Sequence, residues 1–167
     1  NGPIMDTGGH FFLLWQTVFQ SRPQSVYAQG RILARDRPEI ARFAELAIDT
    51  AVITVAYQSG DIATLTVSWG LAAHSRIRPR PDRVFGPSGG VEKSPDGLTR
   101  YQGDQVESVA LPAENLHQKE LSLFADAVAT GKAPPYSFRE GKEMLALTMA
   151  IFRSIETGSV VPVSYDG

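Results

Sequence analysis

The sequence predicts an α+β fold, with a largely antiparallel open sheet and helices on one face of that sheet. Apolar residues recur at helical spacing towards both ends of the chain. Between them lie segments in which β-branched residues alternate with other residues, separated by short turn-forming stretches. Strands that follow one another without intervening helices usually pair antiparallel, and the helices then gather on one side of the sheet.

The N-terminal part is predicted to run helix, strand, short helix. The first helix covers residues 11–19, whose apolar positions have helical spacing (Phe11, Leu14, Trp15 and Val18). Residues 25–34 alternate as a strand does. Charged residues are frequent in residues 35–46, where we expect a short amphipathic helix with Pro38 as its first residue.

A β-hairpin is predicted at the centre of the chain. Residues 50–58 and 62–69 are rich in β-branched side chains and flank a turn with the composition Ser-Gly-Asp. Alternation along the first of these strands separates two faces: Ala51, Ile53, Val55 and Tyr57 on one, and Val52, Thr54 and Ala56 on the other. The second face carries no charged residue.

Shorter strands and two long helices complete the prediction. The helices are expected at residues 114–130 and 139–157, each followed at its C-terminal end by a glycine, Gly131 and Gly158. The strands are expected at residues 83–85, 90–92, 98–102, 106–111 and 160–164.

Length and composition agree with one globular domain over residues 1–167. A formal net charge of −2 gives no indication of binding to nucleic acid or to an anionic membrane surface. The sequence has no cysteine, which excludes disulfides and cysteine metal sites, and no apolar run of the roughly 18 residues that a membrane span requires. No signal peptide is visible at the start, so we expect a cytoplasmic protein, although a leader upstream of residue 1 would escape this reasoning.

The sequence Asp6-Thr7-Gly8-Gly9-His10 directly before the first apolar stretch is the strongest indication of chemistry. If the helix extends back through the glycines, Asp6 and His10 lie four residues apart on one face. A carboxylate can orient an imidazole, and imidazole changes its protonation near neutral pH, so the two form a candidate proton-transfer pair. The alternative is a capping Asp at a helix start and an unrelated surface His.

Three segments in sequence order resemble the Gfo/Idh/MocA oxidoreductases, the family of glucose–fructose oxidoreductase and inositol dehydrogenase. Residues 1–12 are similar to the family motif G-G-x-x-x-D-x-G-x-H. The hairpin segments 49–55 and 60–69 are similar to the family's central hairpin, whose second strand often ends in Ser-x-Trp. Residues 124–135 and 150–158, together with Gly141 and Ala146, are similar to its closing helices. The resemblance covers only the family's C-terminal domain.

That resemblance implies a function for the candidate pair. His10 would exchange the proton of a substrate hydroxyl while hydride moves to or from a nicotinamide, and Asp6 would orient and polarise His10. Gly8 and Gly9 would let a ligand approach the backbone. The implied substrate is a sugar, cyclitol or related polyol, the implied cofactor NAD or NADP in the full-length enzyme, and the implied partner a second copy of the chain through the open sheet face.

The nucleotide-binding half of such an enzyme is not visible in the sequence. No G-x-G-x-x-G motif follows a predicted strand, and the nearest approach, residues 86–90, has the wrong spacing. We therefore expect no cofactor bound to this chain alone and no activity from it alone, because a proton-transfer site without a held hydride acceptor lacks positioning. The competing hypothesis is a stand-alone, non-enzymatic binding or dimerisation module that lost the nucleotide-binding domain.

An arginine-rich stretch supplies a second candidate site. Residues 74–83 contain His74, four arginines including Arg76, and two prolines, and planar guanidinium groups suit carboxylate or phosphate capture. His74 and Arg76 are the candidate substrate contacts in this stretch, while the prolines and the position after a strand favour the alternative, a solvated connector. No metal site is expected, because the three histidines are far apart and no cluster has ligand spacing.

Overall fold

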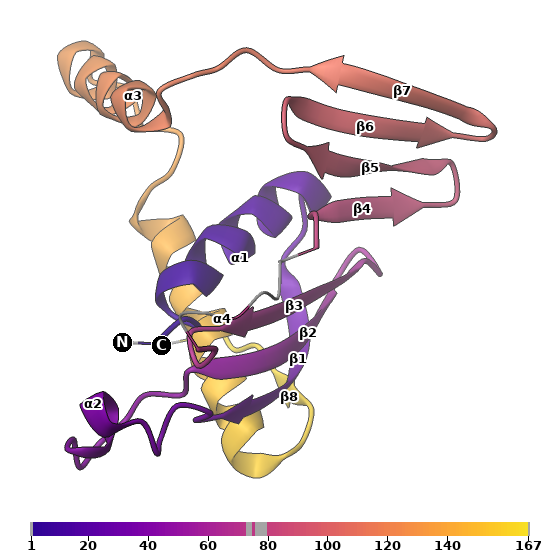
Figure 1. Cartoon of the computed structure of the whole chain (residues 1–167). Helices are drawn as coiled ribbons and strands as arrows, with labels where there is room; N and C mark the ends of the chain where they lie inside the picture. The colour runs from indigo at the N-terminus through magenta and orange to yellow at the C-terminus, as the bar shows by residue number, and fades with distance from the viewer. Residues whose placement is uncertain (1, 73–74, 76–79, 167) are drawn as a thin grey trace. The chain divides into compact units, whose positions relative to one another are not determined.

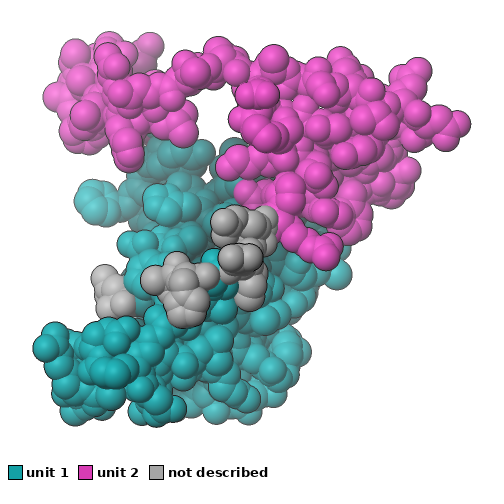
Figure 2. All heavy atoms as spheres, in the orientation of Figure 1, with its two compact units in different colours: residues 1–75, 135–167 teal, residues 76–134 magenta. Residues whose placement is uncertain are grey.

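A computed structural model describes residues 2–72, 75 and 80–166 of the chain (Figure 1). The chain divides into two compact units, which Figure 2 shows in separate colours. The first unit contains residues 1–75 and 135–167, and the second contains residues 76–134. The first unit is therefore built from both ends of the sequence.

The first unit contains a four-stranded antiparallel sheet covered on one face by two helices. Its elements are α1 (Asp6–Phe19), β1 (Pro23–Arg31), α2 (Pro38–Ala41), β2 (Thr50–Tyr57), β3 (Ile62–Ser68), α4 (Phe138–Thr157) and β8 (Val161–Pro162). The strand order is β3-β2-β1-β8. Helices α1 and α4 pack against this sheet and against each other (Figure 1).

The core of the first unit lies between the helices and the inner sheet face. Phe12 of α1 and Leu147 and Ile151 of α4 are at most 2% exposed, and they pack with Ile53 and Val55 of β2. Burial alternates along β2, so Ala51, Ile53, Val55 and Tyr57 are buried, as predicted. Burying these aliphatic and aromatic side chains supplies the main driving force for folding of this unit.

The outer face of the same sheet is left open within the first unit. Val52 is 52% exposed, and Thr54 and Ala56 are half-buried. The strand register places Tyr27 and Thr64 on either side of Thr54. The predicted division of β2 into an apolar inner face and an uncharged outer face is confirmed.

The second unit contains four short strands in consecutive hairpins and one helix. The strands β4 (Arg83–Gly86), β5 (Gly89–Ser94), β6 (Gly97–Gln102) and β7 (Gln105–Ala110) pair antiparallel in sequence order. Helix α3 (Leu116–Thr130) begins after Asn115, whose side chain accepts a hydrogen bond from the Gln118 amide. No described residue of this unit is buried.

The structure confirms the α+β fold with antiparallel, open sheets, but divides the strands between two sheets. The sequence contains no signal for that division, because alternation reports which face a residue occupies and not which strands pair. The helix expected within residues 35–46 is only one turn, α2, with Pro38 as its first residue as predicted. None of the helices in the described ranges is long and apolar enough to cross a membrane.

Candidate functional site

Helix α1 extends back through the glycines and carries the predicted pair in its first turns. Asp6 is the first residue of the helix and His10 follows one turn later. Both side chains are exposed, and their spacing places them on one helix face. No hydrogen bond or ion pair links them among the interactions of the described residues. The Asp6 carboxylate and the His10 imidazole are therefore both accessible to solvent on one face of α1.

The start of α1 is held in place by the four residues before it. The Gly2 carbonyl accepts hydrogen bonds from the amides of Met5 (3.1 Å) and Asp6 (3.2 Å). Ile4 is 1% exposed and belongs to the core. A Cβ at Gly2 would lie 2.5 Å from the Ile48 carbonyl oxygen, so only glycine fits there. Sequence reasoning missed this anchor, although Gly2 belongs to the segment with the family resemblance.

The two glycines between Asp6 and His10 face the protein interior. A Cβ at Gly8 would lie 3.0 Å from the Phe12 ring, and a Cβ at Gly9 would lie 3.1 Å from the Met144 sulfur of α4. Close packing of α1 on its own aromatic side chain and on α4 therefore accounts for both glycines. Approach of a ligand to their backbone stays a prediction.

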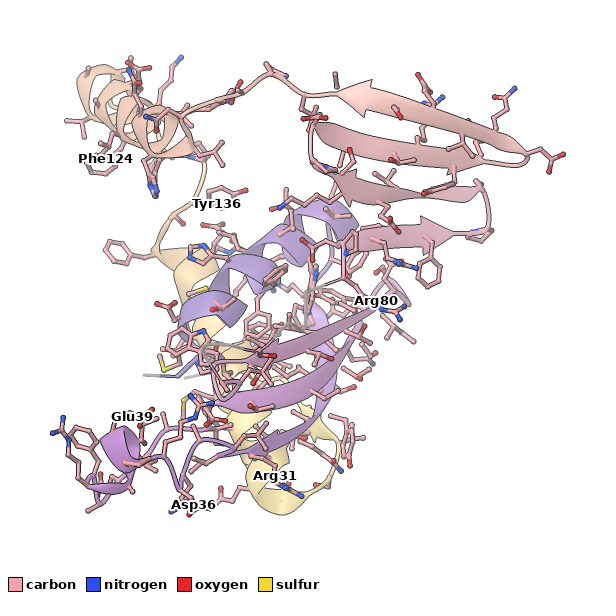
Figure 3. All side chains as sticks on the ribbon, viewed as in Figure 1. Arg31, Asp36, Glu39, Arg80, Phe124 and Tyr136 are labelled. Carbon is pink, nitrogen blue, oxygen red and sulfur yellow. The ribbon has the colours of Figure 1, made fainter. Side chains whose placement is uncertain are left out.

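The exposed face of α1 continues beyond His10 as an apolar strip. Leu14 and Val18 follow at intervals of four residues and are 50% and 48% exposed. Next to this strip the Thr17 hydroxyl lies 3.2 Å from the hydroxyl of Tyr136, which is labelled in Figure 3 just before α4. Asp6, His10 and an apolar strip thus share one face of the helix.

The second predicted site cannot be placed. His74 and Arg76 lie outside the described residues, so their contact with substrate stays a prediction. Of the other arginines in that stretch, Arg80 is exposed and Arg83 forms an ion pair with Glu92 at 3.2 Å across two strands. An exposed pair of this kind contributes little to stability.

The described residues do not fit a nicotinamide dinucleotide site of the usual kind. Such a site needs a glycine-rich turn between a strand of a parallel sheet and a following helix. Every strand pairing in the described ranges is antiparallel. The glycine-rich residues 86–90 form the turn and ends of the β4–β5 hairpin, with Gly86 paired to Gly89. A dinucleotide would have to be held by residues other than these.

Comparison with known proteins gives one family match and several relatives. The model of the GFO/IDH/MocA C-terminal domain matches residues 1–92, more than half of the chain. The myo-inositol 2-dehydrogenase of Thermotoga maritima is 24% identical over 163 residues, which covers 93% of this chain and 47% of that protein. The chain spans about half the length of the curated relatives it matches.

Solved structures show the same fold. The aldose-aldose oxidoreductase from Caulobacter crescentus, complexed with glycerol, superimposes with a TM-score of 0.79 at 20% identity, covering 97% of this chain and 48% of the other. The WlbA dehydrogenase from Bordetella pertussis, in complex with NADH and UDP-GlcNAcA, gives a TM-score of 0.61 at 20% identity and covers 98% and 46%. These relatives are oxidoreductases, and one of them was solved with a nicotinamide cofactor.

The match to the family model over the segment that carries Asp6 and His10, together with the shared fold, decides the classification. The chain belongs to the Gfo/Idh/MocA oxidoreductase family, as its C-terminal domain.

Proposed function

We propose that this chain is the substrate-binding and proton-transfer half of an NAD(P)-dependent oxidoreductase that acts on a sugar, cyclitol or related polyol. The observation that carries the proposal is the exposed face of α1, on which Asp6 and His10 stand one turn apart at the end of a rigidly anchored helix. The names of the relatives, an inositol dehydrogenase and an aldose oxidoreductase, support the substrate class.

In this proposal the chain's own residues bind substrate and move a proton. A hydroxyl of the polyol donates a hydrogen bond to an imidazole nitrogen of His10, which accepts the proton as the hydroxyl becomes a carbonyl. Oxidised NAD(P), held by the nucleotide-binding part of the complete enzyme, would supply the acceptor for the hydride that leaves the same carbon. With substrate bound, the Asp6 carboxylate, one turn earlier, would accept a hydrogen bond from the other imidazole nitrogen and fix the tautomer, a contact that these two described side chains do not make in the structure. The apolar strip of Leu14 and Val18 excludes water on one side of the bound substrate.

The first test concerns the nucleotide-binding part, which the described residues do not supply. We expect an in-frame stretch of about 100–150 residues upstream of residue 1, roughly one domain, with a glycine-rich loop directly after a strand. A gene in which this chain begins without such a stretch would instead favour the non-enzymatic binding module.

The second test is kinetic and uses the complete protein with a panel of polyols and sugars. His10→Gln should lower kcat by about 100-fold or more, because general acid–base catalysis is lost. Asp6→Asn should lower kcat less and shift the pH profile, since it leaves the imidazole in place but removes the negative charge and the orienting carboxylate beside it. His117→Gln, a change at an exposed histidine of α3, serves as the control. Full activity of the His10 variant on every substrate would refute the proposal.

We also propose that the chain forms a homodimer through the open face of its first sheet. Val52, Thr54 and Ala56 give this face an uncharged centre, and Tyr27 adds an aromatic side chain that is 38% exposed. A stable dimer needs about 1,000 Å² or more of buried surface with few charges at its centre, which a sheet face of this composition can provide.

A charge at the centre of that face tests the dimer. Thr54→Lys would place two like charges near a two-fold axis and should convert the dimer to a monomer. Thr130→Lys, at the exposed end of α3, is the matched control and should leave the mass unchanged. Light scattering that gives one mass for the parent chain and both variants would contradict the assignment.

A further inference from the structure

A basic hollow lies at the other end of α1 from Asp6, where the chain passes from α1 into β1. It has a volume of about 250 Å³ and is lined by Arg22, Arg139, Lys142, Glu143 and Tyr165. Arg22 precedes β1, Arg139 and Lys142 lie in the first turns of α4, and Tyr165 follows β8. Three of the five lining residues are cations. The proposed catalytic pair is not part of this hollow.

Among the described residues that line the hollow, Glu143 is the only anion, and both of its carboxylate oxygens already accept hydrogen bonds. Its side chain is 10% exposed. Arg22 Nη2 donates to Oε1, and Gln16 Nε2 of α1 donates to Oε2. Arg139 Nε lies 3.6 Å from Oε1. The other acid in the first turns of α4, Glu140, accepts hydrogen bonds from the amide and the hydroxyl of Ser137 in a capping box.

The cations of the hollow keep donor groups that the fold does not use. The Arg22 side chain donates one of its several N–H groups to Glu143. Its guanidinium carbon lies 5.4 Å from the centre of the Tyr165 ring. That ring is held by the Tyr165 hydroxyl, which donates to the Pro23 carbonyl at 2.7 Å. Lys142 has no ion pair among the described residues.

A purely structural network does not explain this charge balance. A single cation is enough to neutralise the buried Glu143 carboxylate and to link the start of β1 to α4, and Arg22 is that cation. Arg139 forms a second, longer ion pair with the same carboxylate, and Lys142 pairs with no described acid. Three cations around one carboxylate leave an excess of positive charge in the hollow, and like charges in one place repel one another. An anion that enters the hollow would neutralise the excess and accept the unused N–H groups.

Volume and geometry indicate the kind of anion. The 250 Å³ of the hollow exceeds many times the roughly 30 Å³ that one water occupies, and it is below the roughly 300 Å³ of the smallest usual pockets for drug-sized ligands. The donors come from two separate segments, the one before β1 and the first turns of α4. A tetrahedral anion with several oxygens can meet such divergent donors, and Arg and Lys are the residues that bind phosphate.

We propose that Arg22, Arg139 and Lys142 form a binding site for a small phosphate-type oxyanion, separate from the catalytic pair on α1. The site uses Arg22 as the donor fixed by Glu143 and Tyr165, and Arg139 and Lys142 as exposed donors that close on the anion. Neither the family match nor the relatives' names assign a ligand to this place in the fold.

Calorimetric titration of the chain with inorganic phosphate, at constant ionic strength and near neutral pH, tests the proposal. We expect saturable binding at millimolar phosphate or below. The double variant Arg139→Gln/Lys142→Gln should weaken it about tenfold or more, because two charge-assisted hydrogen bonds to the anion are lost. Arg153→Gln, an exposed change on the same helix outside the hollow, should bind as the parent does.

Three outcomes would overturn the proposal. They are absence of saturable phosphate binding to the parent chain, unchanged affinity in the double variant, and equal loss of affinity in Arg153→Gln. Acetate serves as the probe for anion class: binding as tight as that of phosphate would refute the phosphate assignment. Circular dichroism shows whether each variant keeps the parent fold, and we expect it to do so because Arg139 and Lys142 are both exposed.

Discussion

Asp49 joins three parts of the first unit that are distant in sequence. Its carboxylate accepts hydrogen bonds from the amides of Leu33 and Ala34, each 2.9 Å, and from the Thr50 hydroxyl. Its backbone carbonyl accepts a hydrogen bond from Trp69 at 2.7 Å. A Cβ at Gly70 would lie 2.6 Å from an Asp49 carboxylate oxygen, so glycine at that position leaves room for the carboxylate.

These contacts predict a loss of stability in acid. Partial burial raises the pKa of Asp49, but the bonds from Leu33, Ala34 and Thr50 and the charge of Arg37 outweigh it, so the pKa lies below its ordinary value of 3.8. A carboxyl group whose pKa is lowered by folding stabilises the fold above its unfolded pKa, and this contribution disappears as pH falls through the folded pKa.

The measurement is urea unfolding between about pH 6 and pH 3, since the ordinary aspartate pKa of about 3.9 lies inside this range. The parent chain should lose unfolding free energy below about pH 4. Asp49→Asn should be less stable than the parent near neutral pH and should show a smaller loss in acid. Equal acid dependence in both proteins would show that Asp49 is not responsible.

Substitution of Gly8 by alanine tests why α1 contains glycines. A Cβ there would press on the buried Phe12 ring at 3.0 Å, whereas a Cβ at Gly141 of α4 would meet nothing within 4 Å. Gly141→Ala should stabilise the protein by about 0.5–1 kcal/mol through helix propensity. Gly8→Ala gains the same propensity but loses about 1–3 kcal/mol to overpacking, so the net effect should be destabilising.

Thermal or urea unfolding of the two alanine variants decides between packing and ligand approach. If Gly8→Ala is stabilised as much as Gly141→Ala, the packing explanation is wrong, and approach of a ligand to the backbone becomes the better reason for the glycine.

At the scale of elements, one buried hydroxyl connects α4 to β1. Ser154 is fully buried. Its Oγ accepts a hydrogen bond from the Ala28 amide at 2.9 Å and donates to the Ser159 carbonyl at 2.6 Å. The short strand β8 pairs with β1 only at Ser25 and Val26. The Ala28 amide therefore lies beyond the end of β8, and it donates its hydrogen bond to the Ser154 hydroxyl instead of to the backbone of a neighbouring strand.

Ser154→Ala should cost about 1–3 kcal/mol of unfolding free energy, because it leaves the buried Ala28 amide without a partner. Ser159→Ala keeps the carbonyl that accepts from Ser154 and changes only an exposed hydroxyl, so it should stay within about 0.5 kcal/mol of the parent. Chemical denaturation with both variants measures the difference. Equal stabilities would mean that water replaces the Ser154 hydroxyl.

At the scale of the whole molecule, the two units differ in how much core they possess. The first unit buries residues from helices α1 and α4 and from all four of its strands. The second unit has no buried residue among those described, and α3 exposes Leu121, Phe124 and Val128 by 62–70%. A sheet and a helix without a common core are not stable by themselves.

We therefore keep the prediction of a single domain over residues 1–167 and expect the second unit to fold only together with the first. Differential scanning calorimetry of the chain should show one transition, with calorimetric and van't Hoff enthalpies in agreement. Two separate transitions would contradict the single domain. So would hydrogen exchange in which the amides of the second unit's strands lose protection before those of the first unit.

The sequence by itself determined the local structure and the candidate pair. The α+β class, the buried side of β2, the glycines that end α3 and α4, Pro38 at the start of α2 and the shared face of Asp6 and His10 all follow from periodicity and from the backbone preferences of glycine and proline. Such signals act over a few residues, so they can be recognised without knowing what the segment packs against.

Only the tertiary structure decided which distant residues meet. Glu143 is 127 residues from Gln16 and 121 from Arg22, and no local pattern in α4 announces either partner. The same holds for Gly9, because no pattern in α1 predicts that Met144 of α4 lies against it. Which helix lies beside which strand depends on how the complete set of apolar faces packs into one core, and periodicity along the chain contains no information about that choice.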